Sequence, residues 1–329
     1  MKQAVLDIAK KLGGFELARR ANRRSLRILC YHGLWTSPGE PFGECLFMPV
    51  PQFEARMAWL AASQYQVLDL DDAVMRLAND TLPENSVVIT IDDGWRSTFT
   101  DMAPILKKYG LPATLYVSTY YVQRQAIVVN IVVRFILERT TLSTIQTPAF
   151  AQSIAGAYLL TGNANDRTQA AKIINSLIDD IPALDARVAA VFDLAEAAKV
   201  GLDDFEDQFY YVSGDELLQM HKDGMRIELH THRHQSVNKA STDLHREIQD
   251  NREALISFGL SGPFKHFCYP SGDTAQGVAA TLSRLSVLSA TTTSRRVNSP
   301  KYNPFYLGRL LDGHRVLQLD FEAYLSGLI

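Results

Sequence analysis

The sequence predicts an α/β fold in which helices surround a parallel sheet or barrel. Residues 87–91 (Val-Val-Ile-Thr-Ile) form an almost unbroken run of β-formers, as expected of a strand buried on both faces. A helical pattern follows through Ile105 and Leu106, and residues 111–117 then have the pattern of another strand. Alternation of strand and helix along the chain is typical of parallel α/β architecture.

The remaining elements follow in chain order. Asp71 and Asp72 are interpreted as the N-cap and first turn of a helix, not as catalytic acids. Ser213, with Glu216 three residues later, predicts a capping box at the start of another helix. Further predicted strands cover residues 28–32, 67–70, 227–229, 267–270, 287–291 and 306–311.

These assignments divide the chain into four segments. Residues 1–27 are expected to form a basic amphipathic N-terminal helix, and residues 28–119 the first half of a barrel. Residues 120–212 are expected to form a helical insertion, and residues 213–329 the second half of the barrel. A length of 329 residues suits a barrel-sized domain with one addition.

Composition excludes several classes of protein. Hydrophobic residues make up 47% of the chain and charged residues 21%, which is ordinary for a globular protein. The net charge of −3 predicts no general attraction to nucleic acid. Three cysteines form no C-x-x-C pair, which favours a reducing compartment. Without a recognisable signal peptide or membrane span, we expect a cytoplasmic protein, including a peripheral position on the inner face of the cytoplasmic membrane.

Residues 1–27 are unusually basic, with eight Lys and Arg against two acidic residues. Val5, Ile8, Leu12 and Phe15 recur at helical spacing and predict an apolar stripe beside a basic face. One interpretation is an interfacial helix that contacts anionic lipid. The other is a helix that packs on the domain with its basic face in water.

Two clusters of polar side chains follow predicted strands. Asp92 and Asp93 come directly after the strand at 87–91, and three histidines lie within residues 230–234. Adjacent ionised carboxylates are costly unless a positive charge compensates them. Carboxylate oxygen and imidazole nitrogen are a ligand set that zinc accepts, and three protein ligands leave room for water. The sequence therefore predicts a divalent-metal site, with solvated loop histidines as the alternative.

Several motifs resemble the polysaccharide deacetylase family, also called the NodB-homology or carbohydrate esterase 4 family. Residues 90–94 (Thr-Ile-Asp-Asp-Gly) resemble its T-F-D-D-G motif, and residues 230–234 match H-[ST]-x-x-H. Other matches run in family order: residues 30–33 (Cys-Tyr-His-Gly), 267–273 (Phe-Cys-Tyr-Pro-Ser-Gly-Asp), 290–293 (Ala-Thr-Thr-Thr) and 307–310 (Leu-Gly-Arg-Leu). The resemblance implies a distorted (β/α) barrel with a helical insertion.

The resemblance also implies site residues. Asp93, His230 and His234 would hold one divalent ion, which the ligand types suggest is zinc, and Asp92 would act as general base. Tyr269 and Ser271 would lie at the substrate, with a backbone amide near Ser271 in the oxyanion site. His232 falls between the implied ligands and is interpreted as a supporting or surface residue.

The arginine expected in the third motif is absent from that position of the sequence. Many family members carry an arginine in the third motif that holds the catalytic carboxylate, but Cys268 stands at that position here. Arg309 lies near the end of the last predicted strand and can reach the same barrel mouth, so we expect it to pair with Asp92. A structural ion pair is the alternative role for this arginine. His314 is a candidate for the general acid, although the usual L-x-H motif is not clearly present.

The resulting functional hypothesis is a metal-dependent hydrolase that removes an N-acyl group, most simply acetyl, from an amino sugar of a polysaccharide or glycan precursor. The substrate is expected to be an N-acylated carbohydrate, lipid-linked during surface-glycan synthesis. A deformylase of a lipid-linked amino sugar and an inactive carbohydrate-binding homologue are the alternatives. A glycosidase would leave the histidines idle, and no G-x-S-x-G motif supports a serine hydrolase.

Overall fold

The computed structural model describes residues 2–147, 156–160 and 164–329, which divide into two compact units. Unit 1 consists of Met1–Thr36, Glu40–Arg124 and Val212–Ile329. Unit 2 consists of Ser37–Gly39 and Gln125–Tyr211, so its main segment begins at Gln125 and not at residue 120.

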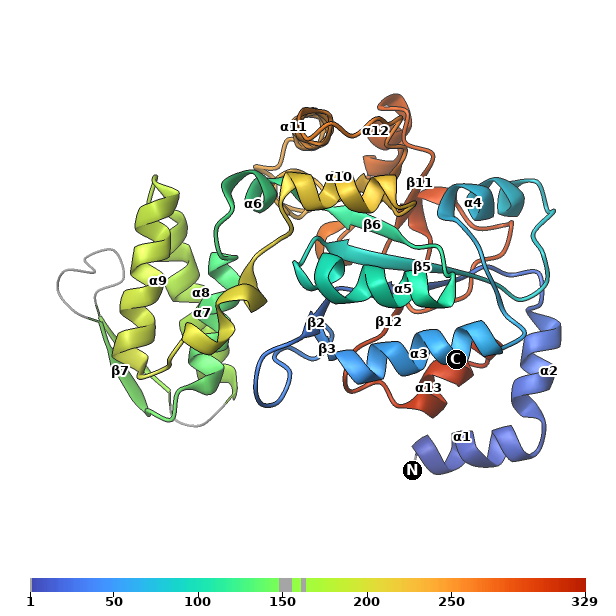
Figure 1. Ribbon diagram of the computed structural model, residues 1–329, viewed down its shortest axis with the longest axis horizontal. Coiled ribbons are helices and arrows are strands. Elements are labelled where there is room, and N and C mark those ends of the chain that lie inside the picture. The colour runs from blue at the N-terminus through green and yellow to red at the C-terminus, as the bar shows by residue number, and fades with distance from the viewer. Residues whose placement is uncertain (1, 148–155, 161–163) are drawn as a thin grey trace. The chain divides into compact units, whose positions relative to one another are not determined.

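Unit 1 is built on a parallel sheet with the strand order β11-β10-β9-β6-β5-β1-β12, and β4 pairs with β5 beside this path (Figure 1). A further parallel bridge joins Thr291 to Leu307, shortly before β12, so the two ends of the sheet meet. The predicted distorted barrel is thereby confirmed, with a narrow seam where it closes. Its strands are β1 (Arg27–Tyr31), β4 (Gln66–Val67), β5 (Ser86–Asp93), β6 (Thr114–Val117), β9 (Arg226–Leu229), β10 (His266–Cys268), β11 (Ser289–Thr291) and β12 (Leu310–Leu311).

Helices cover the outside of this sheet, and a short parallel pair of strands follows β1 (Figure 1). The pair consists of β2 (Gly33–Trp35) and β3 (Phe47–Pro49). The helices are α3 (Val50–Ala62), α4 (Leu70–Ala78), α5 (Ala103–Tyr109), α6 (Thr119–Arg124), α10 (Gly214–Lys222), α11 (Leu244–Ser257), α12 (Val278–Arg284) and α13 (Gln318–Ser326). Short helical turns cover Thr98–Met102, Pro270–Gly272 and Pro304–Tyr306.

The central strand β5 has the burial that its composition predicts. All eight of its residues are buried, as expected of a strand with neighbours on both sides and helices outside. Its polar Thr90 is satisfied, because the hydroxyl donates a 2.7 Å hydrogen bond to the carbonyl of Leu29 in β1. The sheet can therefore carry polar residues toward its carboxyl edge without leaving them unpaired on the way.

The helix caps are partly as predicted. The capping box of α10 is present, with Ser213 and Glu216 bonded to each other's backbone amides. The N-cap of α4 was assigned to the wrong residue: Asp69 accepts from the amides of Asp71 and Asp72. Asp69 is the last extended residue before the helix, which is the conformation an N-cap requires.

The expectation of a single N-terminal helix is wrong. The structure has two helices, α1 (Lys2–Lys11) and α2 (Gly14–Ala21), separated by Gly13 with φ of +79°. A left-handed glycine interrupts helical hydrogen bonding at this point. Arg27, counted with the basic helix, instead begins β1 and is fully buried.

Unit 2 contains more than the predicted helices. Its helices are α7 (Val129–Arg139), α8 (Ala164–Asp179) and α9 (Leu184–Ala198), with a 3₁₀ turn at Asp203–Phe209. The predicted helical insertion is confirmed by these helices, and it also contains two short strands, β7 (Thr144–Gln146) and β8 (Ala157–Leu159), which pair antiparallel. In β7 the central Ile145 is buried between two exposed polar residues, a period-two pattern that favours a strand. Among the described residues, no helix is both long and apolar enough to cross a bilayer.

Candidate active site

The candidate site begins at the carboxyl end of β5, where the chain turns sharply. Asp93 has φ of +75° and Gly94 has φ of +109°. A Cβ atom on Gly94 would lie 2.8 Å from a methyl group of Val117, so this turn requires glycine. Positive φ at an aspartate is uncommon and is typical of sites where the surrounding structure enforces it.

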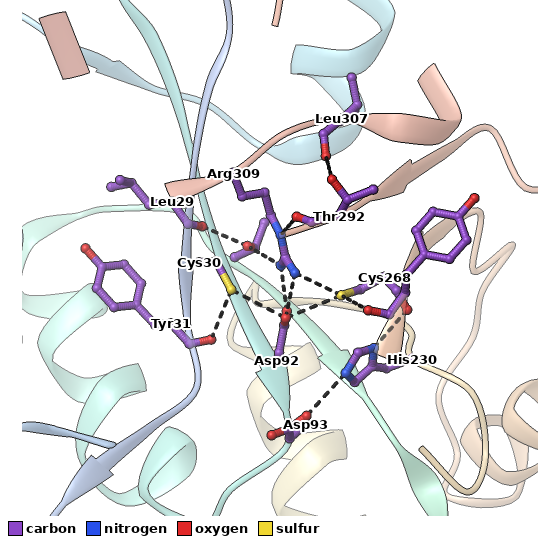
Figure 2. Close-up of polar contacts among 12 residues, drawn as sticks. Leu29, Cys30, Tyr31, Asp92, Asp93, His230, Cys268, Thr292, Leu307 and Arg309 are labelled. Carbon is purple, nitrogen blue, oxygen red and sulfur yellow. Dashed lines mark hydrogen bonds and ion pairs between the residues drawn. The ribbon is translucent and has the colours of Figure 1, made fainter. Parts of the chain in front are cut away.

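Asp92 is held by Arg309 in a buried, bidentate ion pair. Arg309 Nη1 donates to Asp92 Oδ1 at 2.8 Å, and Nη2 donates to Oδ2 at 2.7 Å (Figure 2). Nη1 also donates to the Thr90 hydroxyl at 3.1 Å, and Nε donates to the carbonyl of Thr292 at 3.0 Å. The guanidinium is therefore fixed from several directions, and so is the rotamer of the carboxylate.

Two thiols flank the same carboxylate. Cys30 Sγ lies 3.4 Å and Cys268 Sγ 3.3 Å from Asp92 Oδ2, each placed to donate an S–H bond (Figure 2). Arg309 Nη2 also lies 3.0 Å from Cys268 Sγ. Burial raises the pKa of the Cys30 thiol well above its usual value, so this group is a neutral donor. Cys268 thus occupies space beside Asp92 while Arg309 supplies the charge.

The ion pair determines the charge state of Asp92. Burial on its own would raise the pKa of this carboxyl. The charge and hydrogen bonds of Arg309 outweigh burial and hold the pKa well below its usual range, with smaller contributions from His230 and His32. Asp92 is therefore ionised at neutral pH and able to accept a proton.

Asp93 faces two imidazoles. Its Oδ1 lies 3.2 Å from His230 Nε2 and 3.3 Å from His234 Nε2, and the three ligand atoms lie within 4.8 Å of one another. Asp93 Oδ1 is buried and accepts no hydrogen bond. His230 Nδ1 lies 2.9 Å from the carbonyl of Cys268 and must donate its hydrogen there, because a carbonyl only accepts (Figure 2).

This arrangement fits a cation. Burial opposes protonation of His230, but Cys268 and Asp93 raise the pKa of this imidazole well above its usual value, so without a cation a proton on Nε2 compensates the charge of Asp93. Neutral His230, with its hydrogen on Nδ1, would direct the lone pair of Nε2 toward the lone pairs of Asp93 Oδ1. Two acceptors at this distance repel each other unless a positive charge lies between them. A backbone carbonyl bonded to the far nitrogen is also the usual support of a metal-binding histidine. The residues Asp93, His230 and His234 therefore have the donor set and orientation that a divalent metal requires.

The histidine loop is anchored to α11 and β6. The side chain of Asn251 accepts from the backbone amide of His230 at 3.0 Å and donates to the carbonyl of Val117 at 3.1 Å. Arg233 donates to Glu247 from both its backbone and its guanidinium. His234 has positive φ, like Asp93, so both are held in an uncommon conformation.

His232 points to other partners. Its Nδ1 lies 2.8 Å from the hydroxyl of Thr119, and its ring meets Tyr120 edge-on at 5.8 Å. The side chain is buried, so it is not a surface residue. Its contacts support α6 against the loop, in agreement with a supporting position.

Of the other predicted residues, Ser271 and Tyr269 lie close in the chain to a residue of the site, and His314 contacts none of the site residues that the structure describes. Ser271 has φ of +59° in the turn Pro270–Gly272, directly after the Cys268 carbonyl that orients His230. The Tyr269 ring stacks on Tyr306 with centroids 6.2 Å apart, and its hydroxyl is buried without a partner. Among the described residues, no contact joins the imidazole of His314 to either aspartate or to the two facing histidines. His314 lies in the turn after β12, where its carbonyl faces Gln52.

Sequence reasoning left one site residue open and missed another. A histidine at position 32 is compatible with the active site or with a hydrogen bond within the barrel mouth, and in the structure a ring nitrogen of His32 lies within 4.8 Å of Asp92 and of Cys30 Sγ. Its place after β1 could have shown this, because Tyr31 pairs with Ile91 and the next residues lie side by side. Trp95 was not considered, although its indole N–H donates to Asp93 Oδ2 at 3.0 Å.

Comparison with known proteins assigns a family to this barrel and site. The family model described as polysaccharide deacetylase matches residues 79–146 and 166–288. The chain therefore belongs to the polysaccharide deacetylase family. His32, Arg309 and His314 lie outside the matched residues.

Curated relatives match over shorter segments. The putative polysaccharide deacetylase YxkH of Bacillus subtilis is 40% identical over 92 residues, which cover 28% of this chain and 31% of that protein. The poly-beta-1,6-N-acetyl-D-glucosamine N-deacetylase of Staphylococcus aureus is 34% identical over 71 residues, 22% of this chain and 24% of that protein. The aligned segments thus span a third or less of these relatives.

Solved structures agree in fold. The Streptococcus pyogenes deacetylase PplD superposes with a TM-score of 0.60 at 17% identity, covering 92% of this chain and 98% of that chain. IcaB from Ammonifex degensii gives a TM-score of 0.57 at 16% identity, covering 92% and 97%. At these identities the likeness establishes the barrel fold alone.

Proposed function

We propose that this protein is a metal-dependent hydrolase that removes an N-acyl group, most simply acetyl, from an amino sugar of a polysaccharide or glycan precursor. The observation that carries the proposal is that the two adjacent carboxylates have different partners. Asp93 presents an unpaired oxygen to two imidazole nitrogens, whereas Asp92 is paired with Arg309. The deacetylase names of the matched relatives support the N-acyl sugar as substrate class.

Asp93, His230 and His234 would hold the metal, and a bound cation would acidify a water and polarise the acyl carbonyl. Zinc is the ion we propose, because two imidazoles and one carboxylate form a common catalytic zinc set. Asp92 accepts the proton of the attacking water, and Arg309 keeps this carboxylate from rotating toward the ligands.

The reaction is a hydrolysis. The water oxygen forms a bond to the acyl carbon, the C–N bond breaks, and the amine leaves with a proton. The backbone around Ser271, three residues after the Cys268 carbonyl that accepts from His230, would stabilise the oxyanion. The products are the carboxylate and the free amino sugar.

For the proton donor we propose His32 in place of His314. A ring nitrogen of His32 lies within 4.8 Å of the Asp92 carboxylate, and the ring is only half-buried, so it can face the substrate. His32→Ala should lower turnover at least about tenfold with metal retained, and His314→Ala should leave it near wild type. The opposite ranking would return the role to His314.

An inactive carbohydrate-binding homologue is the rival function. Loss of a ligand would favour it, but the candidate ligands and the Asp92–Arg309 pair are all present. A glycosidase is disfavoured because its two-carboxylate mechanism would give no role to the two imidazoles that face Asp93.

The deciding experiment is product analysis with a panel of N-acetyl and N-formyl amino sugars, free, nucleotide-linked and lipid-linked. The proposal predicts release of acetate that stops with chelator and returns with Zn²⁺. Release of formate only would identify a deformylase. Binding of sugar without release of any acid in the metal-loaded protein would establish the inactive homologue.

For the biological setting we propose a lipid-linked intermediate of surface-glycan synthesis, handled at the inner face of the cytoplasmic membrane. The basic N-terminal segment supports this, because residues 1–27 carry eight Lys and Arg against two acids. This segment would contact anionic lipid.

A further inference from the structure

Helix α1 exposes apolar side chains on a surface where a docked helix normally places polar ones. Val5, Ile8 and Leu12 are 60%, 56% and 79% exposed. Val5 and Ile8 lie on one side of α1, and Leu12, in the turn directly after the helix, continues their spacing because its amide still donates to the carbonyl of Ile8 at 2.9 Å; these three side chains are called here the α1 stripe. Leu17 in the next helix, α2, is 67% exposed.

The exposure is not that of a detached helix, because the neighbouring part of α1 is anchored to the barrel domain. Leu6 is buried in a small cluster with Phe15 of α2 and Ala323 of α13. Polar contacts from Gln3 to Asp320 and from Lys10 to Glu322 fix the same side. Helix α13 therefore covers only part of the apolar side chains of this segment. The α1 stripe is the part that it leaves exposed.

Charge around the α1 stripe matches an anionic surface. Residues 1–26, which precede the buried Arg27, hold seven basic and two acidic residues, and the totals of 33 and 36 leave 26 basic and 34 acidic residues in the rest of the chain. Lys11 and Arg20 are largely exposed, and their ion pairs with Asp7 and Glu16 are of the solvent-exposed kind that contributes little. Both cations can therefore exchange these partners for phosphate oxygens.

We propose that the α1 stripe enters the headgroup region of an anionic lipid bilayer, with α1 parallel to the surface and its other side on α13. This inference rests on the membrane contact of the proposed function and names the surface that makes it. The three side chains of the α1 stripe, with Leu17 of α2, are too few for a stable protein interface, which needs about 800 Å² per partner. An apolar stripe beside long basic side chains is what a fluid anionic interface accepts.

The structure also determines which variant is informative. Deletion of residues 1–27 would remove Phe15 from the core cluster and Arg27 from β1, so loss of binding could reflect misfolding. Val5→Ser, Ile8→Ser and Leu12→Ser, combined, change exposed side chains only. Ile256→Ser in α11 is a matched control, because Ile256 is 61% exposed and lies on another helix.

The test is co-sedimentation of the full chain with vesicles of phosphatidylcholine, with and without phosphatidylglycerol. We expect wild type and Ile256→Ser to bind the anionic vesicles, more weakly at high salt, and the triple variant to bind at least about tenfold more weakly. Lys11→Glu with Arg20→Glu should also weaken binding.

Three results would overturn the inference: equal binding of the triple variant, no binding of wild type, or a wild-type dimer that the triple variant abolishes without vesicle binding. Turnover of a water-soluble N-acetyl substrate separates this inference from the proposed function. The triple variant should retain it fully, and an inactive protein that still binds vesicles would count against the hydrolase alone.

Discussion

Strands β9 and β10 connect two polar ends of one barrel. The carboxylates at one end are paired with basic side chains, whereas a carboxylate oxygen at the other end has no donor. At the amino end, Arg226 donates to both oxygens of Asp69 at 2.8 and 2.9 Å, and Lys265 pairs with Asp71 at 2.8 Å. At the carboxyl end, Asp93 Oδ1 is buried without a donor between two imidazole nitrogens.

The buried acids show the same contrast. Glu228, the third residue of β9, accepts from the amide of His266 at the start of β10, yet burial raises its pKa to about 7. The pKa of Asp92 is instead held well below its usual range against burial by Arg309. A buried acid is thus tolerated at one end by being easily protonated, and kept ionised at the other by a dedicated cation. Burying an ionised carboxylate costs free energy, and this cost is expected where the charge is needed for chemistry.

Replacement of Asp92 should have the largest effect. Asp92→Asn removes the base but no metal ligand, so turnover should fall by on the order of a thousandfold with metal content unchanged. Asp93→Asn should weaken metal binding itself. Metal analysis beside turnover tests both, and an empty site in Asp92→Asn would reverse the two roles.

Arg309→Met should lower turnover about a hundredfold with normal metal content, because Asp92 loses its fixed rotamer. Arg309 lowers the pKa of Asp92, so its removal should raise that pKa and move the acidic limb of the kcat/KM profile to higher pH. Arg56→Met is the matched control, since Arg56 also forms a buried ion pair, with Asp312, away from Asp92. Equal loss of turnover in both variants would mean that Arg309 acts only through stability.

Trp95→Phe should have a moderate effect, through the metal. The indole N–H bonded to Asp93 Oδ2 leaves Oδ1 directed at the histidines, and Phe would keep the ring contact with Phe47 without this donor. Loss of such a support weakens metal affinity by about 10- to 100-fold. Titration with Zn²⁺ measures it, with Trp59→Phe as the control; identical affinity of both variants would remove the role.

Glu228→Gln should leave turnover unchanged and alter only stability. Folding raises the pKa of Glu228 from 4.5 to about 7, so the unfolded chain loses this proton first as pH rises. Wild type should therefore lose roughly 2–3 kcal/mol relative to the variant between these two pH values. Urea unfolding at pH 5 and pH 8 measures the difference, and a gap independent of pH would show that Glu228 is ionised throughout.

The sequence made the proximity at the carboxyl end predictable. Parallel strands end at one edge, so the last residues of β5 and the residues that follow β9 are expected at the same edge. Arg309 could be placed with them because β12 lies beside β1, which lies beside β5.

Other features depend on conformations that a residue pattern does not encode. The bond from Trp95 to Asp93 exists because the chain reverses through two positive φ values at Asp93 and Gly94. The break between α1 and α2 likewise depends on one left-handed glycine, Gly13. Periodicity alone could not separate the short strand β7 from the surrounding helices.

The most direct test of the site compares two histidines of one loop. His230 faces Asp93 Oδ1, whereas His232 faces Thr119, although only one residue separates them. Metal analysis of purified His230→Ala and His232→Ala, each beside wild type with one Zn²⁺ per chain, measures which imidazole is a ligand. The account predicts loss of zinc from His230→Ala and nearly full occupancy in His232→Ala. Equal loss from both variants, or loss from His232→Ala alone, would contradict it.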